Sequence, residues 1–139
     1  MDRRLSNFIV ATQAEFDYFL GKGFVIPTDG IIENQLYGMV KYFGANTCIA
    51  FGYDTREKYV DCYVGKVISG NLEVDRHDGG YWAPLETYLR EVRGIHKYFP
   101  SIGRDAKCRF PELKRFKFIL GEVGELILAD SEKAFLQIS

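Results

Sequence analysis

The chain of 139 residues has no long hydrophobic run and no excess of positive charge. No apolar run approaches the roughly 20 residues that a membrane-spanning helix needs, and the N-terminal residues lack the apolar region of a signal peptide. We therefore expect a cytoplasmic protein without membrane contact. Its 18 basic and 19 acidic residues leave a net charge of −1, whereas nucleic-acid binders usually have a basic excess. Nucleic acid is therefore not expected as a partner.

Cysteine is also scarce, and its spacing is irregular. Cys48, Cys62 and Cys108 form neither a CxxC motif nor a regular framework. Cys48 and Cys62 fall on opposite faces of the hairpin described below, which is a poor arrangement for a disulfide bond. We expect three reduced, buried or half-buried thiols. Phosphate-binding glycine motifs and metal-ligand spacings are absent from the sequence as well, so neither a metal nor a cofactor is expected.

Aromatic residues, in contrast, are abundant. The chain has eleven Phe and nine Tyr against a single Trp, and 47% of its residues are hydrophobic, which excludes general disorder. Such a chain can build its core from Phe and still present Tyr at its surface.

Two segments rich in β-branched and aromatic residues, 47–54 and 58–65, flank a short polar segment and predict an antiparallel hairpin. A two-residue turn at 55–56 would place Phe51 opposite Val60. Alternation assigns one face of this hairpin to the core. The other face combines small residues with aromatic and acidic ones: Ala50, Gly52, Tyr59, Asp61 and Tyr63.

Strand-like alternation extends on either side of this hairpin. Segments 35–43, 47–53 and 58–68 are expected to form a three-stranded antiparallel meander, to which 72–74 adds a short fourth strand or an extended loop. No internal repeat or linker interrupts the sequence, so residues 1–139 are expected to form a single domain.

Helical spacing of apolar residues predicts helices before and after the sheet. The N-terminal helix should begin at a capping box of Thr12 and Glu15, in which each side chain binds the other residue's free backbone N–H. A middle helix should begin near Pro84, and a C-terminal helix should cover 111–137 with a kink or break near its glycines. The expected fold class is α+β, with a meander of three to four strands packed against N-terminal, middle and C-terminal helices.

The polar groups best suited to catalysis lie between the sheet and the middle helix. His77 could act as a general base oriented by a carboxylate, or bind a metal together with Asp75 and Asp78. No spacing marks the further residues that either role needs, and a solvated loop is the simpler interpretation. No residue is assigned a catalytic role, and a small enzyme that uses His77 with nearby carboxylates is kept as an alternative.

The outer face of the hairpin is the better candidate for function. Tyr59, Asp61 and Tyr63 remain once the core is assigned, and tyrosine supplies rigid amphipathic contact area in protein interfaces. Tyr81 and Trp82, just before the middle helix, could extend such a surface. A second alternative is a ligand-binding or self-assembling module with an apolar pocket on this face. That pocket would be lined by Tyr37, Met39, Tyr59 and Tyr63.

The order of these segments resembles a known class of proteins. Phe16-Asp-Tyr-Phe-Leu20 and a Gly23-Phe24 exit precede Cys48-Ile-Ala-Phe-Gly-Tyr-Asp-Thr-Arg-Glu57, and Tyr59-Val-Asp-Cys-Tyr-Val-Gly65 and a closing helix at 113–128 follow. This layout resembles small cytoplasmic proteins encoded beside bacterial polymorphic or contact-dependent toxins, many of which are immunity proteins. The Tyr-Asp-x-Arg-Glu turn, followed by an alternating strand that ends in Gly, is its most specific part.

The resemblance implies a non-enzymatic inhibitor that binds a cognate toxin and blocks its active site. Because such proteins share no fixed set of binding residues, the partner-binding candidates come from surface reasoning alone. Carboxylates among them would suit a basic toxin such as a nuclease, although the near-neutral total charge argues against a strongly acidic inhibitor. The candidates are Tyr59, Asp61, Tyr63, Glu73, Asp75, Asp78, Tyr81 and Trp82.

Overall fold

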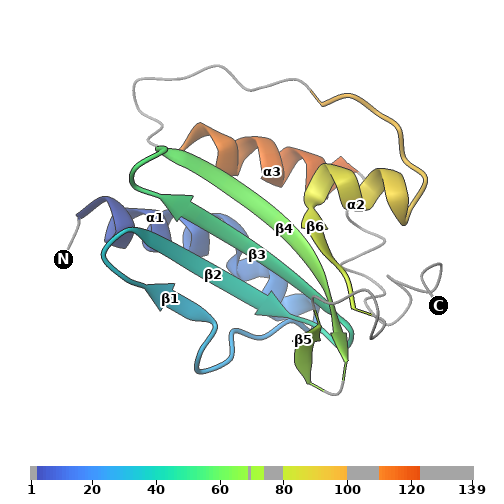
Figure 1. Cartoon of the computed structure of the whole chain (residues 1–139), viewed down its shortest axis with the longest axis horizontal. Coiled ribbons are helices and arrows are strands. Elements are labelled where there is room, and N and C mark those ends of the chain that lie inside the picture. The colour runs from blue at the N-terminus through green and yellow to red at the C-terminus, as the bar shows by residue number, and fades with distance from the viewer. Residues whose placement is uncertain (1–2, 69, 74–79, 100–109, 123–139) are drawn as a thin grey trace.

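The computed structural model describes residues 3–68, 70–73, 80–99 and 110–122. Along the described part of the chain, helices come first, the strands follow, and two further helices come last (Figure 1). In chain order the elements are α1 (Arg3–Phe16), the 3₁₀ helix η1 (Asp17–Lys22), β1 (Ile31–Glu33), β2 (Tyr37–Phe43), β3 (Thr47–Asp54), β4 (Tyr59–Ile68), β5 (Asn71–Glu73), β6 (Trp82–Pro84), α2 (Leu85–Glu91) and α3 (Pro111–Glu122).

All strand pairs are antiparallel, and the sheet runs in the order β1-β2-β3-β4-β5, with β6 also paired to β4. β5 pairs with 66–68 and β6 with 63–65, so two short strands follow one another along the same edge of β4. The predicted α+β class and antiparallel meander are confirmed. The strand count exceeds the three to four expected because β1 and β6 have only three residues each, too few for alternation to be recognised.

The loop between β3 and β4 is longer than predicted. Residues 55–58 connect the strands, and the Lys58 N–H donates to the Asp54 carbonyl oxygen over 2.8 Å. The Asp54 carboxylate oxygen Oδ1 also accepts the backbone N–H of Arg56 over 2.8 Å. Lys58 has a φ of 55°, in the left-handed region, and returns the chain to the ladder. The two-residue turn is therefore wrong, because Asp54 organises a wider loop through its own side chain.

The longer loop shifts the register without exchanging the faces. Phe51 pairs with Cys62, whereas the two-residue turn placed it opposite Val60. The shift is by two residues, and the side chains of a strand repeat with a period of two, so each one stays on its predicted face. The residues assigned to the core are buried: Ile49, Phe51, Val60, Cys62 and Val64.

The N-terminal helix starts at Arg3, well before the predicted capping box. Thr12 is buried within α1, and its hydroxyl donates to the Phe8 carbonyl oxygen over 2.8 Å, so it caps nothing. Leu5, Phe8, Thr12 and Phe16 form one buried stripe, which explains why the helix extends to both sides of Thr12. η1 ends at Gly23, whose φ of 92° lies in the left-handed region that glycine adopts readily.

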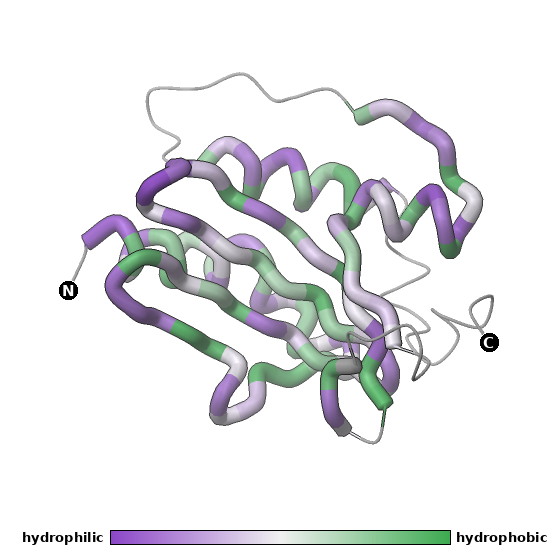
Figure 2. Tube along the Cα trace, viewed as in Figure 1, coloured by the Kyte–Doolittle hydropathy of each residue, from purple (hydrophilic) through white to green (hydrophobic). Residues whose placement is uncertain are grey.

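The later helices cover the same face of the sheet as α1. α3 confirms the first part of the expected C-terminal helix and buries Leu113, Phe116 and Leu120, while the rest of that helix, from 123 on, lies outside the described residues. Lys114 and Lys117 form ion pairs with Glu15, which join α3 to α1. Figure 2 shows hydrophobic and hydrophilic residues alternating along β4, whereas β3 is hydrophobic along most of its length. Within the described ranges, no helix is both long and apolar enough to cross a bilayer.

Candidate functional site

The sheet face turned away from α1 and α3 is called the open face here. It faces the viewer in Figure 1, with α1 behind the strands. A small apolar cluster separate from the main core lies on it, including Cys48, Ala50 and Val67. By strand register, the open face carries Tyr37, Met39, Lys41 and Phe43 of β2, Cys48, Ala50 and Gly52 of β3, Tyr59, Asp61, Tyr63, Gly65 and Val67 of β4, Leu72 of β5 and Trp82 of β6.

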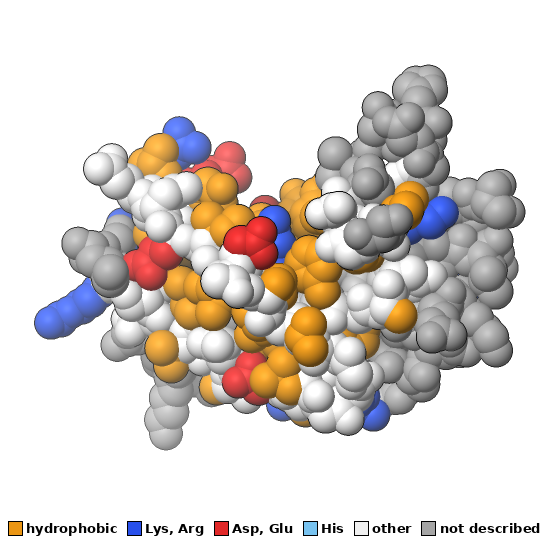
Figure 3. Space-filling model, turned by 90° about the horizontal axis from the view of Figure 1, so that it is seen from below, with side chains coloured by type: hydrophobic (Ala, Val, Ile, Leu, Met, Phe, Trp, Pro, Cys, Tyr) orange, Lys and Arg blue, Asp and Glu red, His pale blue; other side chains and the backbone are white. Residues whose placement is uncertain are grey.

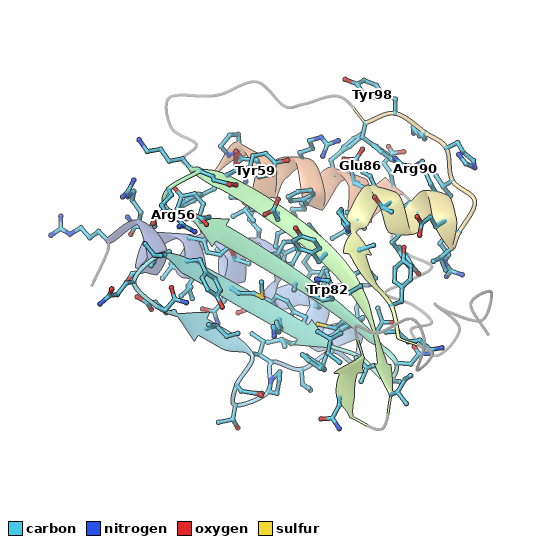
Figure 4. The ribbon with its side chains drawn as sticks, viewed as in Figure 1. Arg56, Tyr59, Trp82, Glu86, Arg90 and Tyr98 are labelled. Carbon is cyan, nitrogen blue, oxygen red and sulfur yellow. The ribbon has the colours of Figure 1, made fainter. Side chains whose placement is uncertain are left out.

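The structure brings together two of the predicted binding residues, Tyr63 and Trp82. Their rings, from neighbouring strands of the sheet, stack with centroids 5.2 Å apart and planes 6° apart. Trp82 is labelled in Figure 4. Trp82 lies opposite Gly65, where an added Cβ would come within 2.5 Å of both the Trp82 ring and the Leu72 Cδ1 atom. The missing side chain at Gly65 therefore provides the space that the indole occupies. From the sequence, Gly65 was noted only as the end of an alternating strand, although a glycine within a β-branched strand is a known sign of such close approach.

Tyr81, also a candidate, points to the other side. It is 2% exposed, its ring meets Tyr88 of α2 edge-on, and its hydroxyl donates to the Glu91 carboxylate over 3.2 Å. Because Trp82 points to the open face, strand alternation turns Tyr81 into the core. Tyr81 therefore supports β6 and α2 and does not extend the open face.

Asp61 lies on the open face between Tyr59 and Tyr63 and opposite Gly52. No hydrogen bond or ion pair joins its carboxylate to any other residue in the described part of the chain. Burial raises the pKa of Asp61, and the negative charges of Glu57 and Asp54 raise it further. The open face thus contains an ionisable group whose charged form no hydrogen bond or ion pair stabilises among the described residues.

Tyr59, at the start of β4, is the most exposed ring of the row, at 49%. Partial burial raises the pKa of Tyr59, and the charge of Asp61 adds to this effect, while Arg115 of α3 opposes it. Arg115 donates from Nη2 to a Glu86 carboxylate oxygen over 2.5 Å and to the Phe99 carbonyl oxygen over 2.8 Å. Charged side chains of α2 and α3 therefore border this end of the open face, as the positions of Tyr59 and Glu86 show in Figure 4.

A pocket of about 390 Å³ lies toward the other end of the open face. Figure 3 shows hydrophobic side chains gathered on the described surface of the molecule as seen from below. The pocket is lined by Val25, Pro27, Asp29, Lys41, Phe43, Gly44, Ala45, Val67, Gly70, Asn71 and Leu72. It includes none of the four residues expected to line a ligand pocket, because those residues lie nearer the β3–β4 loop.

The remaining candidates cannot be placed. Asp75, His77 and Asp78 lie outside the described residues, as does the side chain of Glu73 at the end of β5. The enzyme and metal alternatives built on these residues stay predictions. Among the residues that are described, no group of three His, Cys, Asp or Glu side chains is arranged to hold a metal ion.

The two described cysteines are buried and free, as predicted. Cys48 belongs to the open-face cluster and Cys62 to the main core, on opposite sides of the sheet. Burial raises the pKa of Cys48 to about 12 and that of Cys62 well above its usual range. Because the thiolate is the reactive form, neither thiol is suited to nucleophilic chemistry near neutral pH.

The setting of Asp61 predicts that Asp61→Asn stabilises the free protein at neutral pH, by about 0.5 kcal/mol, the size of screened like-charge repulsion on a sheet. The pKa of Asp61 is higher in the folded than in the unfolded chain, so its ionised form costs stability. The advantage of the variant should therefore shrink as the pH falls through this raised pKa toward about 4. Urea denaturation of both proteins at several pH values measures it.

Asp54→Asn is the matched control. Arg56, through its side chain and its backbone N–H, holds the pKa of Asp54 below its usual range, so the ionised form of Asp54 favours folding. This variant should be less stable than the wild type at neutral pH and should lose that difference in acid. Equal responses of the two variants would contradict the description of Asp61.

No protein-family model matches this chain, and neither a curated protein nor a solved structure does.

Proposed function

We propose that this chain is a non-enzymatic binding protein that neutralises a cognate bacterial toxin by binding it through the open face. The observation that carries the proposal is the Tyr63–Trp82 stack on a sheet face that the described helices leave uncovered. Tryptophan and tyrosine dominate the energetically important positions of protein interfaces. Here they stand beside the small residues Ala50 and Gly52, which are themselves buried beneath neighbouring side chains of the sheet.

The stack has the order that a binding surface needs before its partner arrives. Trp82 is held by strand pairing to β4, and the absent side chain of Gly65 fixes the place of the ring. A side chain that is already ordered loses little conformational entropy on binding, so more of its contact energy appears as affinity. The anchors of the open face are in this respect preorganised.

The choice of a toxin as the partner rests on the resemblance of the sequence to immunity proteins. The most specific part of that resemblance, the turn of Asp54, Arg56 and Glu57, forms the tight loop at one end of the open face. An ion pair of 3.2 Å between Arg56 and Asp54 holds it further. The motif and the proposed surface therefore belong to the same hairpin.

The test is co-expression with the product of the neighbouring gene, followed by measurement of the complex and of toxicity. We expect a stable complex and relief of toxicity, and we expect Tyr63→Ala to weaken binding by about tenfold or more because it removes an anchor and frees Trp82. Trp82 is the single tryptophan of the chain, so its fluorescence reports binding at the site directly.

Tyr98→Ala is the control for this experiment. Tyr98 is 80% exposed after α2 and lies away from the open face (Figure 4), so the same truncation there should leave affinity unchanged. Circular dichroism of both variants checks that each is folded. The proposal fails if no neighbouring toxin exists, and the open face is not the site if the two variants bind equally well.

A further inference from the structure

The carboxylate of Asp61 is the feature of the open face that aromatic packing leaves unexplained. Its cross-strand neighbour Gly52 has no side chain, and the nearest atom to a Cβ built there is the Met39 methyl at 3.4 Å. Tyr59 and Tyr63 flank Asp61 along β4. Partial burial raises the pKa of Tyr63, and the negative charge of Asp61 adds to this effect. Asp61 therefore lies among aromatic and small apolar groups.

The hairpin loop gives this carboxylate no counterion. The negative charges of Glu57 and Asp54 both add to the rise in the pKa of Asp61 that burial causes. Arg56 is paired with Asp54 over 3.2 Å and bends back along the loop. Lys41 also lies on the open face, but its positive charge affects the thiol of Cys48, where it opposes the rise in pKa that burial causes.

Helices α2 and α3 add charges near Tyr59, but these do not neutralise the site either. Arg115 is already bonded to Glu86 and to the Phe99 carbonyl oxygen, so its charge is satisfied within the chain. Glu112, in the first turn of α3, contributes a further negative charge. The surroundings of Asp61 are complementary to a cation with flat apolar faces.

Building on the function proposed above, we propose that the toxin supplies an arginine whose guanidinium lies over Asp61, between the rings of Tyr59 and Tyr63. A guanidinium donates two parallel hydrogen bonds to a carboxylate and also stacks on aromatic rings. A lysine would supply the charge but not the flat donor fork. The partner surface that covers this end of the open face is therefore basic, which complements the carboxylate of Asp61.

The site can be tested on the full chain without its partner. The ¹⁵N-labelled protein is titrated with N-acetyl-arginine methylamide and, separately, with the neutral isostere N-acetyl-citrulline methylamide at constant ionic strength. We expect the arginine probe to shift the amide signals of Gly52, Asp61 and Tyr63. Its apparent affinity should be about tenfold higher than that of the citrulline probe, because citrulline cannot form a charged hydrogen bond to the carboxylate.

Two variants locate the binding. Asp61→Asn should reduce the affinity for the arginine probe to that for citrulline. Glu33→Gln removes the same charge on β1, opposite Gly38 and on the other face of the sheet, and should leave the titration unchanged. Equal shifts with both probes, no shift with either, or an unchanged titration of the Asp61 variant would each overturn the proposal.

The complex with the toxin separates this inference from the proposed function. If the complex forms and Asp61→Asn binds the toxin as tightly as the wild type does, the arginine contact is refuted while the proposed function stands. If the arginine probe binds as expected but no neighbouring toxin forms a complex, the toxin partner is refuted and the cation site remains.

Discussion

Replacing Phe51 with alanine should lower the free energy of unfolding by about 3–5 kcal/mol, the range for truncation of a buried phenylalanine. Phe51 is fully buried at the centre of β3, and its ring stacks on that of Phe16 in α1 with centroids 4.0 Å apart. Phe116 of α3 and Tyr42 of β2 also contact it, so the cavity left by alanine would open between the sheet and both helices. Urea denaturation followed by far-ultraviolet circular dichroism gives the change in unfolding free energy.

Phe118→Ala provides the comparison at an exposed position. Phe118 lies on α3, as Phe116 does, but is 51% exposed, so its truncation removes little buried area and should change stability by no more than about 0.5 kcal/mol. If the two variants were equally stable, the layer of rings between α1, α3 and the sheet would not be the core of this protein.

The core could be predicted from the sequence because alternation in a strand survives local errors. The β3–β4 hairpin was expected with too short a turn, yet the two-residue shift preserved each face, and Phe51 and Val60 are buried as predicted. The start of α1 was missed for a different reason. A Thr and a Glu three residues apart mark a helix start only when the Thr precedes the apolar stripe, whereas Thr12 lies within it.

The candidate site was predictable where it depends on one strand and not where it depends on pairing between distant strands. Tyr59, Asp61 and Tyr63 share a face because they are consecutive odd positions of β4. The contact of Trp82 with Tyr63 depends instead on β6, which has three residues and reaches β4 across a long connection. Sequence alternation carries no information about such pairing, so Tyr81 and Trp82 were both expected at the surface although only Trp82 lies on the open face.

Gly65→Ala should destabilise the protein by about 1–3 kcal/mol, the usual cost of an added group in a packed site. The new Cβ would approach the Trp82 ring and the Leu72 methyl to 2.5 Å, well inside contact distance. Leu72 can move its flexible end, but Trp82 is a rigid ring held by β6, so the indole must shift, which disturbs its stack on Tyr63. The near-ultraviolet circular dichroism and fluorescence of the single tryptophan should change together with the midpoint of urea denaturation.

Gly52→Ala makes the same chemical change on the same face with the opposite expectation. Its Cβ would meet the end of the flexible Met39 side chain at 3.4 Å, an ordinary contact, and alanine lowers the entropy of the unfolded chain. Stability should therefore stay the same or rise by up to about 1 kcal/mol, without a change in the Trp82 signals. Because Gly65 sets the position of Trp82, Gly65→Ala should also weaken toxin binding. Equal losses in the two variants would mean that the close approach at Gly65 does not order the anchor of the open face.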